Sequence, residues 1–126
     1  MSESDRAIIL FAHGARDPQW AAPFGRIRRE LQAARPGTPV ELAFLEQMQP
    51  SLEVAVANAV AQGARRIVLV PLFMAQGGHL KRDLPLLLDA LRVRHAQIEF
   101  RVLPAIGDAP EILRAIVDWV LGAARE

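Results

Sequence analysis

Four short apolar runs alternate with segments whose apolar residues recur at helical spacing, and this alternation restricts the possible folds more than any other feature. The runs cover residues 7–12, 40–45, 66–72 and 98–103. Each has the length and the β-branched content of a strand. A strand-then-helix order repeated along the whole chain predicts an α/β fold with a parallel sheet and right-handed crossover connections.

The expected architecture is a single three-layer α/β domain spanning residues 1–126. Its four-stranded parallel sheet should have the flavodoxin-like strand order 2-1-3-4, with helices on both faces. The first and third runs are apolar throughout, so we expect both of their faces to be covered. The fourth run alternates apolar and charged residues, which is typical of a half-exposed edge strand.

Proline, glycine and aspartate residues indicate where the helices should begin and end. Pro23 should lie in the first turn of the first helix, and Pro36-Gly37 should end it. Gly63 should follow the second helix as its C′ residue, Pro85 should lie near the start of the third, and Asp108 should cap the fourth. The apolar stripes on these four helices are Phe24, Ile27 and Leu31; Leu52, Val56, Ala59 and Val60; Leu84, Leu87, Leu88 and Leu91; and Ile112, Ile116, Trp119 and Val120.

Composition excludes several classes of function. The chain has no cysteine, so disulfides, thiolate nucleophiles, thiolate metal sites and iron–sulfur clusters are excluded. With 15 basic and 14 acidic residues the net charge is +1, which gives no electrostatic reason to expect a nucleic-acid or membrane partner. Because no leader-like or membrane-spanning run occurs in the sequence, we expect a cytoplasmic protein.

The expected site lies at the carboxyl edge of the sheet, where open α/β sheets bind their ligands. His13 follows the first strand, Glu46 follows the second, and His79 lies in the long segment after the third. His95, the remaining histidine, falls at the opposite edge, at the end of the third helix. This distribution places two histidines and one carboxylate at the same edge.

Each of these residues has a functional and a structural interpretation. His13 is a metal ligand or general base, or it hydrogen-bonds a loop carbonyl; Gly14 beside it allows backbone or ligand to approach closely. Gly77-Gly78 before His79 indicates an unusual backbone or a close ligand. Together, His13, His79 and Glu46 form a set that could bind a divalent first-row metal weakly and accept protons.

Three cations lie on the same loops. Arg16, Lys81 and Arg82 can each be solvated charges, but together they predict an anionic ligand. We expect Phe73 and Met74 to be core residues that could also form an apolar wall, and Trp20 and Trp119 to pack on the first and fourth helices.

Four motifs, H-G-A-R-D-P at 13–18, F-L-E at 44–46, P-S-L at 50–52 and P-L-F-M-A-Q-G-G-H-L-K-R-D-L-P at 71–85, cover the strand ends. In these motifs the chain resembles the short sirohydrochlorin cobaltochelatases, small class II chelatases related to the sirohydrochlorin ferrochelatases. The resemblance extends from the first predicted strand to the fourth predicted helix. Ala15 departs from it where many members have Ser, and Gln47-Met48-Gln49 replaces the commoner small and acidic residues.

The resemblance implies insertion of Co²⁺ into sirohydrochlorin for cobalamin synthesis, with Fe²⁺ insertion for sirohaem synthesis as the next expectation. It implies no ATP and no cofactor besides the substrate metal ion. By that resemblance His13 and His79 would take up the metal and accept the pyrrole protons, with Glu46 assisting. It also implies a homodimer with the tetrapyrrole in a cleft shared by two copies. The residues expected to contact the substrate are Arg16, Gly77, Gly78, Lys81 and Arg82.

Other functions use the same residues. A metal or tetrapyrrole carrier would have the same site without turnover. A phosphate-binding protein would use His13, Arg16 and the glycine-led helix, although the G-x-x-x-x-G-K-[ST] pattern is absent. A flavin module would need a Ser/Thr-rich phosphate cradle after the first strand, and this chain lacks one. Cobalt, iron and nickel accept overlapping N and O ligands, so the residues alone do not select among them.

Overall fold

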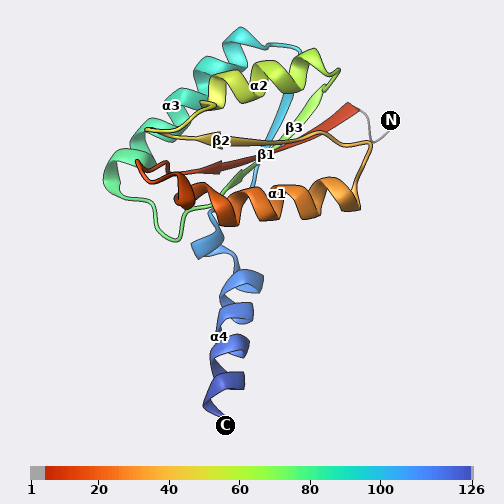
Figure 1. The fold of residues 1–126 in the computed structure, drawn as a ribbon. Helices are drawn as coiled ribbons and strands as arrows, with labels where there is room; N and C mark the ends of the chain where they lie inside the picture. The colour runs from red at the N-terminus through yellow and green to blue at the C-terminus, as the bar shows by residue number, and fades with distance from the viewer. Residues whose placement is uncertain (1–4, 126) are drawn as a thin grey trace.

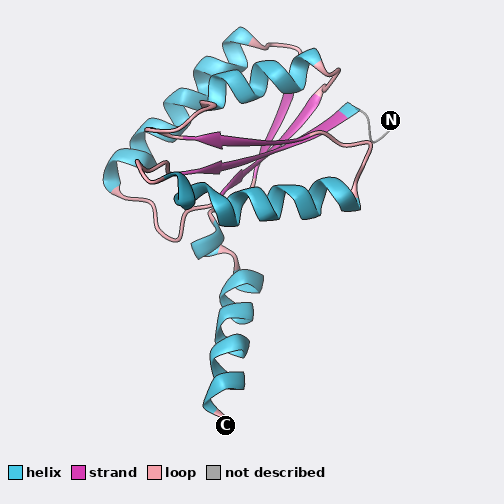
Figure 2. Ribbon diagram, viewed as in Figure 1, coloured by secondary structure: helices cyan, strands magenta, loops and turns pink. Residues whose placement is uncertain are grey.

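The chain folds around one parallel sheet, seen in a computed structural model that describes residues 5–125 (Figures 1 and 2). The elements are β1 (Arg6–Ala12), η2 (Pro18–Ala21), α1 (Ala22–Ala34), β2 (Val40–Phe44), α2 (Leu52–Ala61), β3 (Arg66–Pro71), α3 (Gly78–Arg94), β4 (Glu99–Val102), η3 (Ile106–Asp108) and α4 (Pro110–Ala124). None of the helices in the described part of the chain is long and apolar enough to span a membrane. Expectations for Met1 to Ser4 and for Glu126 lie outside the described residues.

The strand order is β2-β1-β3-β4 with every pair parallel, as the sequence predicts. The register places Ile9 of β1 between Glu41 of β2 and Leu69 of β3. β4 is an edge strand on which exposed and half-buried residues alternate, so this prediction is also confirmed. The parallel arrangement brings the carboxyl ends of β1, β2 and β3 to one edge.

Helices cover the two faces of the sheet unequally. α1 lies along one face, next to β2 and β1, whereas α2 and α3 lie together on the other (Figure 1). The core lies under α2 and α3, where Ile9, Phe11 and Leu69 pack with the buried residues of both helices. Because side chains alternate along a strand, Val68 and Val70 of β3 face the side of α1, and both are only half-buried. The prediction that both faces of the third strand are covered is therefore wrong.

Most helix ends have the residues that the sequence predicts for them. Pro23 lies in the first turn of α1, and Gly63 follows α2 as its C′ residue with a φ of 96°, a conformation that favours glycine. Two predictions are wrong. Pro85 lies inside α3, which begins at Gly78, and the N-cap of α4 is Ala109 with no side-chain hydrogen bond from Asp108.

α4 extends away from the sheet (Figure 1). It has no buried residue along its length, and its main contact is with η3. Trp119, predicted to pack, is 78% exposed. Trp20 lies in η2 rather than in the first helix and is 45% exposed. His95 ends α3 as its C-cap, as expected.

Candidate metal and tetrapyrrole site

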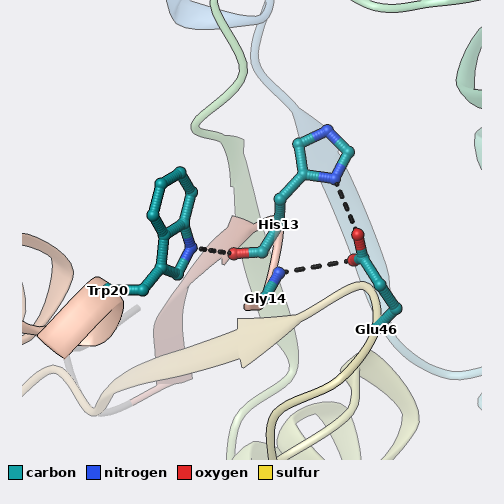
Figure 3. Close-up of polar contacts among 4 residues, drawn as sticks. All are labelled: His13, Gly14, Trp20 and Glu46. Carbon is teal, nitrogen blue, oxygen red and sulfur yellow. Dashed lines mark hydrogen bonds and ion pairs between the residues drawn. The ribbon is translucent and has the colours of Figure 1, made fainter. Parts of the chain in front are cut away.

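The carboxyl edge of the sheet carries a histidine–glutamate pair (Figure 3). His13 leaves β1 directly, and Glu46 lies two residues beyond the end of β2. His13 Nδ1 lies 3.1 Å from Glu46 Oε1, and the backbone N–H of Gly14 donates to Glu46 Oε2 over 3.3 Å. Both side chains are nearly half exposed, at 46% for His13 and 42% for Glu46. The fold thus places these two residues at the same edge of the sheet, as the sequence predicts, and brings them into contact.

The hydrogen bond to Glu46 fixes the chemistry of the imidazole. An ionised carboxylate only accepts hydrogen bonds, so the proton of a neutral His13 must lie on Nδ1. The lone pair is then on Nε2, which lies on the side of the ring away from Glu46 (Figure 3). An accessible imidazole nitrogen held in one tautomer by a carboxylate is suited to bind a divalent metal or to accept a proton.

Gly14 makes this pairing possible. A Cβ built on Gly14 would overlap the carbonyl oxygen of Glu46 and would lie 3.1 Å from the backbone nitrogen of Met48. The loop is tight here, since Gln47 has a φ of 64° and Met48 N–H donates to the Glu46 carbonyl over 2.8 Å. The prediction that Gly14 permits close approach is confirmed, and the approaching group is backbone.

Two aromatic residues hold His13 in place, and neither was expected to do so. Trp20 Nε1–H donates to the carbonyl of His13 over 2.7 Å (Figure 3). Asp17 supports η2, which carries Trp20, by accepting from the Gln19 backbone N–H over 2.9 Å. The ring of Phe73 lies 4.7 Å from the His13 ring in an edge-to-face arrangement. Phe73 is 2% exposed, which confirms its prediction as core, whereas Met74 is 57% exposed, so its prediction as core is wrong. Nothing in the sequence pattern indicates the contact of Trp20.

His79 lies in the first turn of α3, after the N-cap residue Gly77. Its Nδ1 accepts from Arg82 Nη2 over 3.4 Å, and Arg82 Nε donates to the Gly78 carbonyl over 3.2 Å. His79 is therefore engaged with a cation, whereas His13 is engaged with a carboxylate. Among residues 5–125 no group of three His, Asp or Glu side chains is close enough to hold a metal, so the three predicted ligands are not gathered around one point.

The remaining predicted residues surround this edge without contacting the histidine–glutamate pair in any recorded hydrogen bond. Arg16, Lys81 and Arg82 are exposed. Gly77 has ordinary extended dihedral angles, φ −68° and ψ 169°, and Gly63 is the one glycine with positive φ between residues 5 and 125. Of the two alternatives predicted for Gly77-Gly78, the unusual backbone is thus wrong, and the close approach of a ligand stays a prediction. Open space surrounds the position of a Cβ at both glycines.

Comparison with protein families decides the assignment. The CbiX family model matches residues 7–122, nearly the full chain. The chain belongs to the CbiX family. It is 35% identical over 102 residues to the sirohydrochlorin cobaltochelatase of Saccharolobus islandicus (strain L.S.2.15 / Lassen #1), covering 78% of both chains. It is 32% identical over 85 residues to the sirohydrochlorin cobaltochelatase of Methanococcus aeolicus, where the match covers 68% of this chain and 59% of the relative.

Solved structures have the same fold as this CbiX chain. A CbiX protein from Marinobacter aquaeolei VT8 superposes with a TM-score of 0.80 at 32% identity, covering 95% of this chain and 98% of that one. The sirohydrochlorin chelatase SirB of Bacillus subtilis subspecies spizizenii, solved with cobalt, gives a TM-score of 0.76 at 26% identity. That match covers 90% of this chain and 49% of SirB, so the present chain spans about half of the longer protein.

Proposed function

We propose that this chain is a sirohydrochlorin chelatase that inserts Co²⁺, with Fe²⁺ as the next candidate, into sirohydrochlorin. The observation that carries the proposal is the nearly half-exposed side chain of His13, whose Nδ1 lies 3.1 Å from Glu46 Oε1 so that Nε2 is on the side of the ring away from the carboxylate. The CbiX family match and the SirB structure with cobalt support the same chemistry. No cofactor is required besides the metal ion, which is a substrate.

Metallation replaces two pyrrole N–H protons by one divalent cation, so the site must accept two protons for each metal inserted. His13 Nε2 can bind the incoming metal or accept one proton. Glu46 stabilises the positive charge that His13 gains, because its carboxylate lies beside the ring. Glu46 acts in this proposal mainly as an orienting and charge-compensating group, since both of its oxygens already accept hydrogen bonds.

His79 supplies the second nitrogen, and substrate binding can release it. In the unliganded fold Arg82 donates to His79 Nδ1 over 3.4 Å, a long hydrogen bond. A carboxylate of sirohydrochlorin is a stronger acceptor for a guanidinium than a neutral imidazole is. If it engages Arg82, the lone pair on His79 Nδ1 is freed for the metal or for a proton.

The basic loop residues fit an anionic tetrapyrrole. Arg16, Lys81 and Arg82 are exposed around the edge that carries His13. Gly77 and Gly78 leave open space where other residues would carry a Cβ, so a flat ring can approach the start of α3. Side chains with forked or flexible cationic ends can bind the peripheral carboxylates while the ring centre faces the histidines.

We further propose that the active form is a homodimer with the tetrapyrrole between two copies. The support is the openness of the site within one copy, where His13 and Glu46 remain nearly half exposed. A macrocycle held on one open edge would expose its second face to water, whereas a second copy would cover that face. Light scattering coupled to size exclusion tests the mass of the species that elutes with bound sirohydrochlorin.

Anaerobic metallation assays test the chelatase proposal. Sirohydrochlorin is supplied in excess over protein with Co²⁺ or Fe²⁺, and its visible spectrum is followed. We expect many turnovers per chain, and a loss of about 10²-fold or more in His13→Ala, the scale of one acid–base group. His79→Ala should also lose rate. His95→Ala is the matched control, because His95 lies at the end of α3, and its rate should equal that of the unmodified chain.

Two outcomes would contradict the proposal. If neither metal is inserted faster than in protein-free solution by a folded chain, the site is that of a carrier. If His13→Ala and His79→Ala both keep the full rate, insertion occurs elsewhere on the molecule.

A further inference from the structure

The carbonyl of His13 lies just past the hydrogen bonds of the sheet. The Ala12 carbonyl, the last of β1, accepts from the Leu45 backbone N–H over 2.8 Å. One residue further, the His13 carbonyl accepts from Trp20 Nε1–H over 2.7 Å. This distance is at the short end of the range for N–H···O hydrogen bonds. A side chain therefore holds the first carbonyl that lies beyond the strand.

The His13–Gly14 peptide is held from both sides. Its carbonyl accepts from Trp20, and its N–H, which belongs to Gly14, donates to Glu46 Oε2 over 3.3 Å. The C=O and N–H of a trans peptide point in opposite directions within one rigid plane. Trp20 and Glu46 accordingly approach this peptide from opposite sides (Figure 3). A rotation of the plane that breaks one contact also disturbs the other.

The short helix η2 fixes the base of the Trp20 side chain. Asp17, its N-cap, accepts from the Gln19 backbone N–H through its carboxylate over 2.9 Å. The carbonyl of Asp17 accepts from the Trp20 backbone N–H over 3.0 Å. Pro18 begins the helix with a restricted φ. The indole N–H therefore reaches His13 from a backbone that has hydrogen bonds of its own.

The ring of Trp20 is also linked to the strand that leads to Glu46. The ring centroids of Trp20 and Phe24 are 6.0 Å apart, and those of Phe24 and Phe44 are 6.4 Å apart. Both separations are within the range of interacting aromatic rings. Phe44 ends β2, two residues before Glu46. Trp20 is therefore connected to both residues of the histidine–glutamate pair, to His13 by a hydrogen bond and to Glu46 through two rings and the chain.

We propose that Trp20 is a positioning residue for metallation, which holds the His13–Gly14 peptide so that Glu46 stays hydrogen-bonded to both residues. This proposal rests on the proposed function, in which His13 Nε2 binds the metal or accepts a proton. Trp20 acts through His13 and contacts no reacting atom. The two bonds to Glu46, at 3.1 and 3.3 Å, are long for hydrogen bonds to a carboxylate, so a small displacement of the peptide weakens both.

The kinetics of Trp20→Phe test this role. Phenylalanine keeps an aromatic ring beside Phe24 but has no donor for the His13 carbonyl. We expect kcat for Co²⁺ insertion to fall about tenfold, the lower end of the loss for an outer-shell partner, with the KM for sirohydrochlorin within about twofold. Gln19→Ala is the matched control in η2, because Gln19 is exposed and its backbone makes the bond to Asp17. An unchanged kcat in Trp20→Phe, with or without a raised KM, overturns the proposal.

The tautomer of His13 is a readout that does not depend on activity. The chain has three histidines, so nuclear magnetic resonance of ¹⁵N-labelled protein gives few imidazole signals. With neutral imidazoles at about pH 8, His13 of the unmodified chain should carry its proton on Nδ1, beside Glu46. In Trp20→Phe we expect forms protonated on Nδ1 and on Nε2, with the His95 signals unchanged. An unchanged His13 tautomer in a folded Trp20→Phe chain overturns the proposal whatever the rate.

A double-mutant cycle tests whether η2 acts through Trp20. Asp17→Ala removes the carboxylate that accepts from Gln19 and should lower kcat by less than Trp20→Phe does. In a chain that already carries Trp20→Phe, Asp17→Ala should have little further effect on kcat, because the donor that η2 positions is gone. Additive losses in the double variant overturn the route from Asp17 to His13.

The two readouts separate this proposal from the proposed function. If the unmodified chain does not insert metal, the chelatase proposal fails, and the His13 tautomer in Trp20→Phe still decides the role of Trp20. If the unmodified chain inserts metal and Trp20→Phe has the same kcat and the same tautomer, the role of Trp20 is refuted and the chelatase proposal is intact. Urea unfolding shows whether Trp20→Phe is folded; if it is not, Asp17→Ala takes its place in both measurements.

Discussion

Replacing Gly14 by alanine should damage both stability and activity, and the structure gives the size of the effect. The added Cβ would overlap the carbonyl oxygen of Glu46 and would lie 3.0 Å from its carbonyl carbon. Both are backbone atoms, so no side-chain rotation can relieve the overlap. The backbone of Gly14 itself does not have the positive φ that favours glycine, so the cost is steric.

The expected loss of stability is about 1–3 kcal/mol, the range for overpacked sites. Alanine stiffens the unfolded chain and returns about 0.4–1 kcal/mol, which leaves a net loss of about 1–2 kcal/mol. For a chain of this length that corresponds to a fall in Tm of about 3–10 °C. Moving the Glu46 loop also breaks the contact with His13 Nδ1, and loss of such an outer-shell partner lowers activity about 10–100-fold.

Thermal unfolding followed by circular dichroism, together with the anaerobic metallation assay, measures both effects. Gly37→Ala is the matched control, since nothing lies within 4 Å of its Cβ position and its φ is not positive. That variant should keep its rate, and its Tm should be unchanged or higher by the effect of about 0.4–1 kcal/mol on the unfolded chain. A Gly14→Ala chain with unchanged Tm and unchanged rate would refute the argument that Gly14 exists to admit the Glu46 backbone.

Three further changes have defined outcomes. Glu46→Gln should lower the metallation rate about 10–100-fold, because an amide no longer fixes the His13 tautomer; an unchanged rate with Co²⁺ would contradict this role. Trp20→Phe removes the hydrogen bond to the His13 carbonyl and should cost about 0.5–1.5 kcal/mol, measured by urea unfolding. Gly63→Ala, at a φ of 96°, should cost about 1–2 kcal/mol with an unchanged rate, since the residue ends α2, away from His13; Gly63→Asn should cost less, and equal losses would argue against backbone strain.

The sheet could be predicted because its signal is local and repeated. Four apolar runs separated by helical segments leave few topologies, and the observed order β2-β1-β3-β4 is the expected one. The coverage of the sheet could not be predicted in the same way. An apolar run such as residues 66–72 indicates that burial is favourable, but it does not say which element covers each face. Val68 and Val70 are half-buried because α1 packs mainly against β2 and β1.

The errors at helix ends have a similar cause. A proline marks a helix start because it lacks an N–H, yet Pro85 is accommodated inside α3, where the buried residues Leu80, Leu84 and Leu88 stabilise the helix on both sides. Asp108 is a residue type that often caps helices, but here it is the last residue of η3. Its backbone N–H donates to the Ala105 carbonyl over 2.8 Å. Burial of neighbouring leucines decided the first case, and a competing local hydrogen bond decided the second.

The site was predictable as an edge of the sheet and not as a set of contacts. Topology places His13, Glu46 and the start of α3 at the carboxyl ends of parallel strands, which the sequence shows directly. That Glu46 contacts His13 depends on the positive φ of Gln47 and on the missing side chain of Gly14. Such dihedral and steric details have no periodic signature in a sequence.

Two glycines connect the site to the helix that leaves the domain. Gly14 lies against the backbone of Glu46, and Gly107 lies against the backbone of Met74, and neither position has room for a Cβ. Phe73 lies between them, with its carbonyl bound by Gly107 and its ring beside His13. A shift of η3 must therefore move Phe73, and a shift of Phe73 changes the packing of the His13 imidazole. Because α4 continues from η3 after one residue, the backbone contacts of η3 connect the start of α4 to the packing of the His13 ring. The direction in which α4 leaves the domain and the packing of the His13 ring therefore depend on one packed junction.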